Sequence, residues 1–241
     1  MPGLSEPARL LRAWEHASAV PATARGAVLV WHGGYAEGLE PALRLPVGEL
    51  SARAGRLYAE EFGDRIEALL SCGDCGEVLD VTLPLAALRA GTPDTEDRVP
   101  APDGGEFTVR ALTTGDLLAA GGAADPAAEL LARCVTDASG GSVDPSGLPP
   151  ELLARVETVA ERLAGAAGAV VRTACPACGR ETTAPLDLGA LLWDRVAAEA
   201  PVLLAEVATL AAAFAWREAD VLELSPARRA AYLRLARGGA A

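Results

Sequence analysis

The sequence predicts a mainly helical α+β fold, in which two repeated helix–knuckle–strand units are followed by a C-terminal bundle of helices. Three observations support this fold class. Apolar residues recur at helical spacing over several long stretches, most of all near the C-terminus. Short runs such as EVLDVTL and FTVRALT are typical of strands. The motif Cys-x-x-Cys-Gly occurs twice, which marks the two knuckles.

Composition limits the classes of function. The 241 residues are 51% hydrophobic, which is enough for a folded core. The net charge is −12, and an acidic surface repels phosphate backbones, so we expect no nucleic-acid partner. All 21 basic residues are arginine, which excludes a Schiff-base or Walker-type lysine. Protein partners suit this chain better.

The chain is expected to act in the cytoplasm. Its first residues, MPGLSEPARLLRAWEH, lack the basic and apolar segments of a secretory signal. The most apolar stretch, Val202–Trp216, carries Glu206 in its middle, so we expect a buried helix and no membrane insertion. Five cysteines in such a compartment favour metal binding over disulfides.

In the first half of the chain, glycine and proline separate the predicted elements. Gly33-Gly34 and Pro41 interrupt the chain after the first helix. We predict helices over 5–20 and about 47–70, a strand over Glu77–Leu83 and a polar loop over 91–105.

The second half begins with a strand and ends in long helices. We predict a strand over 107–113, short helices over Asp116–Ala120 and Pro126–Val135, a loop over 137–147, a helix over about 149–165, a strand over Ala169–Thr173, a hairpin return over Arg180–Thr183, and helices over about 187–214, 216–222 and 226–237. Pro201 is expected to break or kink the first of these last helices. Ser225 followed by Pro226 is a good start signal for the last one.

An internal repeat relates the two knuckles. At an offset of 103 residues, Leu45-Pro46 falls on Leu148-Pro149, and the first cysteine motif with its glycine falls on the second. Each unit reads Leu-Pro, helix, Cys-x-x-Cys-Gly, strand, Leu-x-Leu-x-x-Leu. We therefore predict two pseudo-equivalent halves that share one site.

The repeat divides the chain into five segments within one compact domain. They are an N-terminal helical segment (1–44), a first helix–knuckle unit (45–90), an inserted strand and helix region with loops (91–147), a second helix–knuckle unit (148–191) and the C-terminal helices (192–241).

The two cysteine pairs predict one structural zinc ion per chain. Zinc prefers four thiolate or imidazole ligands in a tetrahedron, and each Cys-x-x-Cys turn supplies two. The predicted ligands are Cys72, Cys75, Cys175 and Cys178. The glycine after each second cysteine favours a turn with positive φ. Four thiolates leave no open position for water, so the ion is expected to be structural. A thioredoxin-like pair or an iron–sulfur cluster is the alternative use of these cysteines.

Other candidate residues favour ordinary structural roles. Cys134 lies in a helical pattern and is expected to be a buried, unligated thiol. His16 is expected on a helix surface, and His32 in or next to a turn. Trp193, Trp216 and Tyr232 are expected to pack in the C-terminal helices. The arginine-rich last helix is an alternative docking surface. No arrangement of nucleophile, base and acid is present in the pattern, so we expect no enzyme and no small-molecule substrate.

Several stretches together resemble a known family. They are LLRAWE near the N-terminus, LPVGEL before CGDCG, FTVRALTTGDL, LPPELL before CPACG, APLDLGALLWDRV and FAWREADVLELSPARRAAYL. This order resembles the baseplate hub assembly proteins of T-even-like contractile phages, whose relatives accompany phage-like contractile injection systems. The resemblance implies a non-enzymatic baseplate or hub component, or an assembly chaperone, with hub, baseplate or tail proteins as partners. The residues alone leave open a zinc-ribbon adaptor or regulator, and a thiol oxidoreductase.

Overall fold

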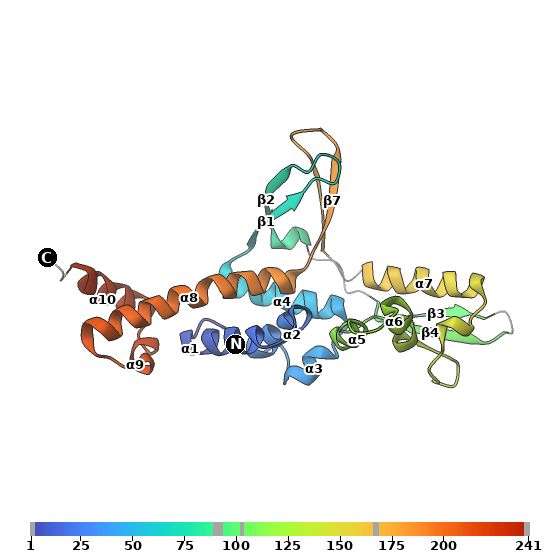
Figure 1. Ribbon diagram of the computed structural model, residues 1–241, viewed down its shortest axis with the longest axis horizontal. Helices are drawn as coiled ribbons and strands as arrows, with labels where there is room; N and C mark the ends of the chain where they lie inside the picture. The colour runs from blue at the N-terminus through green and yellow to red at the C-terminus, as the bar shows by residue number, and fades with distance from the viewer. Residues whose placement is uncertain (1–2, 89–93, 102–103, 166–168, 239–241) are drawn as a thin grey trace.

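The computed structural model describes residues 3–88, 94–101, 104–165 and 169–238. Figure 1 shows an elongated molecule with a helical body at its centre, a small lobe at one end and the C-terminal helices at the other. An arm of two hairpins projects from the body. The mixed fold, mainly helical with small sheets, agrees with the predicted class.

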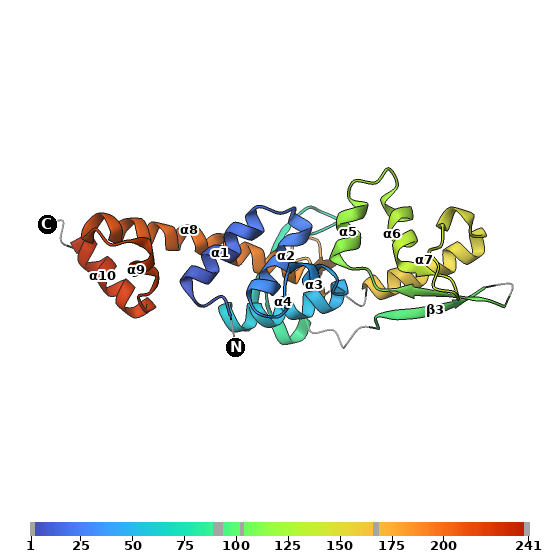
Figure 2. The same ribbon diagram turned by 90° about the horizontal axis from the view of Figure 1, so that it is seen from below.

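The body consists of α1 (Pro7–Ser18), α2 (Ala22–His32), α3 (Leu39–Leu43), α4 (Val47–Phe62) and the first part of α8 (Leu188–Phe214). Figure 2 shows α1, α2 and α4 gathered beside α8. α2 and α8 approach closely because glycines meet at their crossing: a Cβ added to Gly26 would lie 3.1 Å from the Cα of Gly189. One hydrophobic cluster runs from Leu4 through this body to Val196.

The arm contains two antiparallel hairpins. β1 (Arg65–Ser71) pairs with β2 (Val78–Pro84), and β6 (Ala169–Ala174) pairs with β7 (Glu181–Leu186). Alternate residues of β1 are buried, as in a strand with one covered face. A short 3-10 helix, η1 (Leu85–Leu88), follows β2. The inner side chains of both hairpins belong to the same hydrophobic cluster as the body.

The prediction of one helix over 47–70 is wrong. α4 ends at Phe62, and Gly63 at φ 95° turns the chain into β1. The apolar residues Ile66, Ala68 and Leu70 fit a strand as well as a helix, and pairing with β2 decides in favour of the strand.

The lobe has a three-stranded sheet with the order β3 (Glu96–Pro100), β4 (Glu106–Arg110) and β5 (Val135–Thr136). The helices α5 (Thr114–Ala120), α6 (Pro126–Cys134) and α7 (Pro150–Gly165) accompany it, with a short η2 (Pro145–Gly147). The lobe has a hydrophobic cluster of its own, which includes Val109 and Val156. The expected loop over 91–105 is corrected, because β3 occupies Glu96–Pro100; residues 91–93, 102 and 103 lie outside the described part.

The C-terminal end consists of the rest of α8 with α9 (Glu218–Leu222) and α10 (Pro226–Gly238), close to the predicted ranges. α8 runs through Pro201 without a break in the helix. Trp216 and Tyr232 pack together with their rings 4.8 Å apart, and Trp193 lies under the Arg25 guanidinium. By length and composition α8 could cross a membrane. The expectation of a buried helix over Val202–Trp216 is corrected, because Val202, Leu204 and Phe214 are exposed. The absence of membrane insertion stays a prediction.

Candidate metal centre

Each hairpin of the arm ends in a turn that carries two cysteines. Cys72 follows the last residue of β1, and Cys175 follows the last residue of β6. In the first turn, the Cys72 N–H donates to the Glu77 carbonyl at 2.8 Å, and the Gly76 N–H donates to the Cys72 carbonyl at 2.9 Å. The second turn repeats both bonds: Cys175 N–H to the Arg180 carbonyl at 2.8 Å, and Gly179 N–H to the Cys175 carbonyl at 2.8 Å. The two turns therefore have the same backbone conformation.

The glycine that follows each second cysteine has the conformation expected from the sequence. Gly76 lies at φ 75° and Gly179 at φ 72°, in the left-handed region. This conformation bends the chain back so that both sulfur atoms of a pair face the same point. The prediction of positive φ at these glycines is confirmed.

The four predicted ligands come together at the tip of the arm. The Sγ atoms of Cys72, Cys75, Cys175 and Cys178 all lie within 4.8 Å of one another. The Sγ atoms of Cys72 and Cys178 are 3.8 Å apart, and those of Cys75 and Cys175 are 3.7 Å apart. A disulfide would need about 2.05 Å. A tetrahedron with metal–sulfur bonds of about 2.3 Å has edges of about 3.8 Å, so the donor set fits a tetrahedral ion such as zinc.

The centre lies between the arm's interior and solvent. Cys72 and Cys175 are buried and belong to the main hydrophobic cluster, whereas Cys75 and Cys178 are exposed. Across the two turns, the Arg180 guanidinium pairs with the Asp74 carboxylate at 3.3 Å. This ion pair joins the hairpins a second time, beside the sulfur atoms.

The pKa values of the clustered thiols differ. The Thr182 hydroxyl, with backbone N–H groups of the first turn, lowers the pKa of Cys72 to about 6. This hydroxyl is buried and makes no hydrogen bond of normal geometry within the described part of the chain. It therefore lowers the pKa of Cys72 as a nearby dipole. The Glu77 N–H lowers the pKa of Cys75, but the neighbouring thiols and burial outweigh it and raise the pKa to about 12. Ionisation of a second and third thiol beside the first thiolate is therefore unfavourable, because their negative charges repel. A bound divalent cation would neutralise that charge.

The four thiols form a possible metal site. Four thiolates would fill a tetrahedral shell and leave no position for water or substrate. The hydrogen bonds of the turns hold the donors in place. Thr182 is a buried polar residue, with an effect on the pKa of Cys72, that sequence reasoning missed. Its only signal in the sequence is its inward position in the alternation of ETTAPL.

Two other candidates lie apart from the cluster, as expected. Cys134 is buried at the end of α6, where burial raises the pKa of its thiol. The imidazoles of His16 and His32 meet between α1 and α2, with 2.8 Å between Nδ1 and Nε2. Burial and the neighbouring charge of His16 lower the pKa of His32. In the described residues, neither histidine belongs to a group of three or more potential metal ligands.

The helices of the two pseudo-equivalent units pack in different parts of the molecule. α4 and α7 contain 16 residues each and each precedes a hairpin. α4 packs in the body, however, and α7 packs on β3 and β4 in the lobe. The equivalence of the two halves, and the division into five segments, therefore stay predictions.

Comparisons with protein-family models, with curated proteins and with solved structures found no match to this chain.

Proposed function

We propose that Cys72, Cys75, Cys175 and Cys178 bind one structural zinc ion that ties the two hairpins together. The observation that carries this proposal is the spacing of the four Sγ atoms, which suits a tetrahedral zinc–thiolate centre. The ion would join chain segments about a hundred residues apart and hold the arm upright on the helical body. The matching bounds of α4 and α7 at the 103-residue offset support the further proposal that two repeated units share this ion.

Elemental analysis of the purified protein tests the zinc proposal. We expect about one zinc per chain, lost in the double variant Cys75→Ser/Cys178→Ser and kept in Cys134→Ser, which serves as the matched control because Cys134 lies outside the cluster. Iron with visible absorbance would assign an iron–sulfur cluster. Four reactive thiols without metal would favour a thiol oxidoreductase and contradict the proposal.

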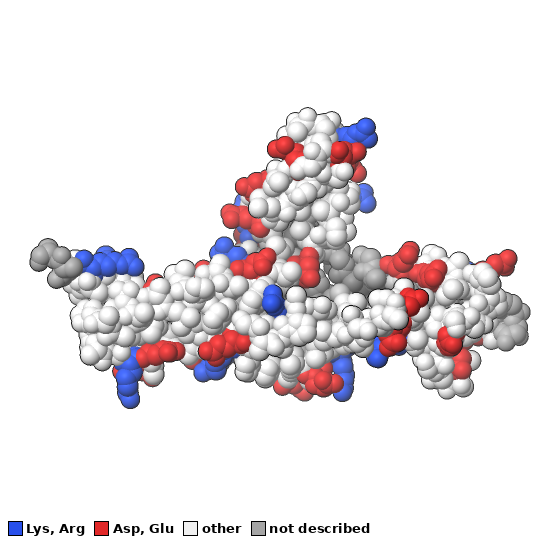
Figure 3. All heavy atoms as spheres, viewed as in Figure 1, with Lys and Arg blue, Asp and Glu red and all other residues white. Residues whose placement is uncertain are grey.

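We further propose that the protein has no catalytic activity and is a baseplate or hub component, or an assembly chaperone, of a contractile tail or injection system in the cytoplasm. The sequence resemblance described above supports the tail assignment. The structure adds a surface suited to protein contacts, on the outward face of α8. Asp194, Arg195 and Glu199 are exposed near the start of α8. From position 200 to 212 the exposed residues are all uncharged: Pro201, Val202, Leu204, Ala205, Ala208 and Ala212. Figure 3 shows wide areas without charged side chains along this part of the molecule, with charges gathered at the edges.

Co-purification tests the functional proposal. The full chain, co-expressed with the tail, hub and baseplate proteins encoded beside its gene, is expected to retain at least one of them. Leu204→Glu/Ala208→Glu should weaken that complex at least tenfold, because charge enters an apolar contact. Leu69→Glu is the control: Leu69 is 73% exposed, on the arm. Absence of neighbouring tail genes and of any such complex would contradict the proposal, and retention of transcription proteins instead would favour a zinc-ribbon adaptor.

A further inference from the structure

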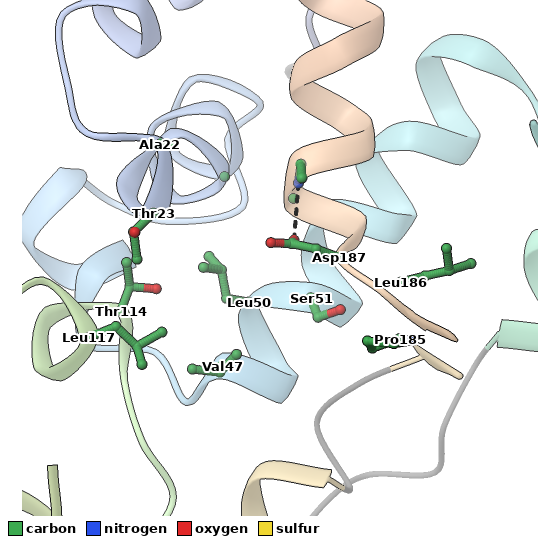
Figure 4. A pocket seen from close by; sticks show the side chains of 13 residues that line it. Ala22, Thr23, Val47, Leu50, Ser51, Thr114, Leu117, Pro185, Leu186 and Asp187 are labelled. Carbon is green, nitrogen blue, oxygen red and sulfur yellow. Dashed lines mark hydrogen bonds between the residues drawn. The ribbon is translucent and has the colours of Figure 1, made fainter. Parts of the chain in front are cut away.

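A pocket lies where the arm, the body and the lobe meet (Figure 4). Its volume is about 500 Å³, which lies in the range of pockets that hold small molecules. The end of β7, the start of α8, and parts of α2, α4 and α5 line it. The pocket is separate from the four cysteines and from the exposed face of α8.

The first turns of three long helices meet at this pocket. Ala22 and Thr23 begin α2, Val47 begins α4, and Asp187 caps α8. The Asp187 carboxylate accepts a hydrogen bond from the Ala190 N–H at 3.0 Å, which satisfies the start of α8. α2 and α4 instead begin after prolines and have no side-chain cap. At the start of α4, however, the Val47 N–H donates to the Leu112 carbonyl at 2.9 Å. Among the described residues the N–H groups of Ala22 and Thr23, at the start of α2, have no such partner, and with the positive end of the helix dipole they favour an acceptor with negative charge.

A buried hydroxyl provides independent support for a ligand. Thr114 is 2% exposed, and within the described chain its hydroxyl has no hydrogen-bond partner. Figure 4 shows this hydroxyl directed into the pocket, toward Leu50. Leaving a nearly buried donor unpaired is costly, so the hydroxyl needs a partner, and that partner can reach it only through the pocket. The hydroxyls of Thr23 and Ser51 also line it.

The remaining lining defines the class of ligand. Most of it is apolar, with Val47, Leu50, Leu117 and Leu186 among its members. Asp187 is the one charged residue among those that line it, and arginine and histidine are missing from that lining. A multiply charged phosphate would therefore find no counter-charge. A single carboxylate could use the hydroxyls and the uncapped start of α2, while an apolar chain fills the rest of the pocket.

We propose that this pocket binds an apolar monocarboxylate, with the Thr114 hydroxyl and the first turn of α2 facing the carboxylate. The source is either a free short-chain acid or the C-terminal residue of a polypeptide. This inference rests on neither the zinc ion nor the tail assignment.

Calorimetric titration of the full, metal-loaded chain tests the proposal. Sodium octanoate is expected to bind with a Kd of about 0.1–1 mM, as a good ligand of this size can. Octanamide should bind at least tenfold more weakly. The Kd of N-acetyl-Leu-Leu as the free acid, compared with that of its amide, tests whether the pocket binds the C-terminal carboxylate of a polypeptide. Whichever acid binds more tightly, octanoate or N-acetyl-Leu-Leu, identifies the natural kind of ligand. Equal binding of acids and amides, or no saturation by either acid below about 10 mM, would overturn the proposal.

Two variants locate the site. Thr114→Val should weaken octanoate binding at least tenfold, while Thr158→Val, whose hydroxyl bonds within α7, should not change it. Ala190→Trp provides a second route, because Ala190 is exposed and lines the pocket, so a large ring there blocks the cavity without disturbing the core. Folding of each variant is checked by circular dichroism. Wild-type affinity in folded Ala190→Trp would overturn the assignment to this pocket, and water alone would then satisfy Thr114.

Discussion

Single residues determine the shape of the two cysteine turns. Gly76 and Gly179 adopt positive φ, which a Cβ disfavours, and the sequence pattern identified both. A Cβ at either position would meet no atom within 4 Å. Any cost of a side chain there would therefore come from the backbone conformation and not from crowding.

The first prediction concerns these glycines. Gly179→Ala is expected to lower the free energy of unfolding by about 1–2 kcal/mol, because alanine resists the left-handed conformation. Gly73→Ala is the matched control, since Gly73 lies in the first turn, has equal space and does not have positive φ. Urea unfolding in the presence of zinc measures both. Equal destabilisation by the two variants would contradict the argument.

A second set of residues joins β4 to α5 in the lobe. The Asp116 carboxylate receives two hydrogen bonds from Arg110, at 2.7 and 3.0 Å, and one from the Thr113 N–H at 2.9 Å. Burial would raise the pKa of Asp116, but these bonds and the charge of Arg110 lower it to about 2. Local sequence indicates the cap at Thr113; the arginine partner depends on the sheet.

The Arg110–Asp116 ion pair predicts that the free energy of unfolding depends on pH. The pKa of Asp116 is below the value of 3.8 that it has when unfolded, so the carboxylate stabilises the fold above about pH 4. As pH falls from about 4 to 2, this contribution of about 2 kcal/mol is lost. Urea unfolding between pH 6 and 2.5 should show a shallower decline for Asp116→Asn than for the natural chain. Parallel curves would contradict the assignment.

At the scale of elements, β1 illustrates why local patterns mislead. RIEALLS contains good helix formers, and a helical prediction through it is reasonable. The strand forms because β2 pairs with it residue by residue and buries alternate side chains. The glycine at position 63, followed by Asp64, is the signal that the helix ends. Pairing between separate segments cannot be read from either segment alone.

The helix α8 shows the opposite case, in which a helix continues despite a breaking residue. Pro201 lies near its middle, is exposed, and lacks the N–H that would bond to the preceding turn. Packing of the buried residues on both sides, such as Ala200 and Leu203, holds the helix together.

The third prediction follows from this position. Pro201→Ala is expected to raise the free energy of unfolding by about 1–3 kcal/mol, because a helical hydrogen bond is restored and no buried contact is lost. The converse variant Ala208→Pro, one further exposed position along the same helix, should lower it by about 3 kcal/mol or more. Thermal unfolding of both tests this. Destabilisation by Pro201→Ala would mean that the proline's shape is required.

At the scale of the whole molecule, the arm connects parts of the chain that are distant in sequence. β2 leads through η1 toward the lobe, and β7 leads directly into α8. A bound ion at the tip would therefore restrain both the start of α8 and the end of α4. The body has its own apolar core and does not depend on the ion for burial.

The fourth prediction is that metal removal loosens the arm before the body. Treatment with a strong chelator should lower the free energy of unfolding by several kcal/mol, less than the roughly 10 kcal/mol found for isolated zinc peptides, because the core remains. Limited proteolysis should then cut first at 71–80 and 174–181. Cys134→Ser should respond to chelation as the natural chain does. Unchanged stability and cleavage after complete metal loss would contradict a structural role.

The sequence alone determined the features that depend on local chemistry. Residue type and spacing were sufficient for the cysteine turns with their glycines, for most helices, and for the start of α10 at Pro226, because capping, turn geometry and helical period act within a few residues. The tertiary structure alone decided β1 and β3, the Thr182 hydroxyl beside Cys72, the Asp74–Arg180 ion pair and the pocket at the starts of three helices. Each of these requires segments far apart in the chain to meet, and the burial and pairing that bring them together leave no local pattern.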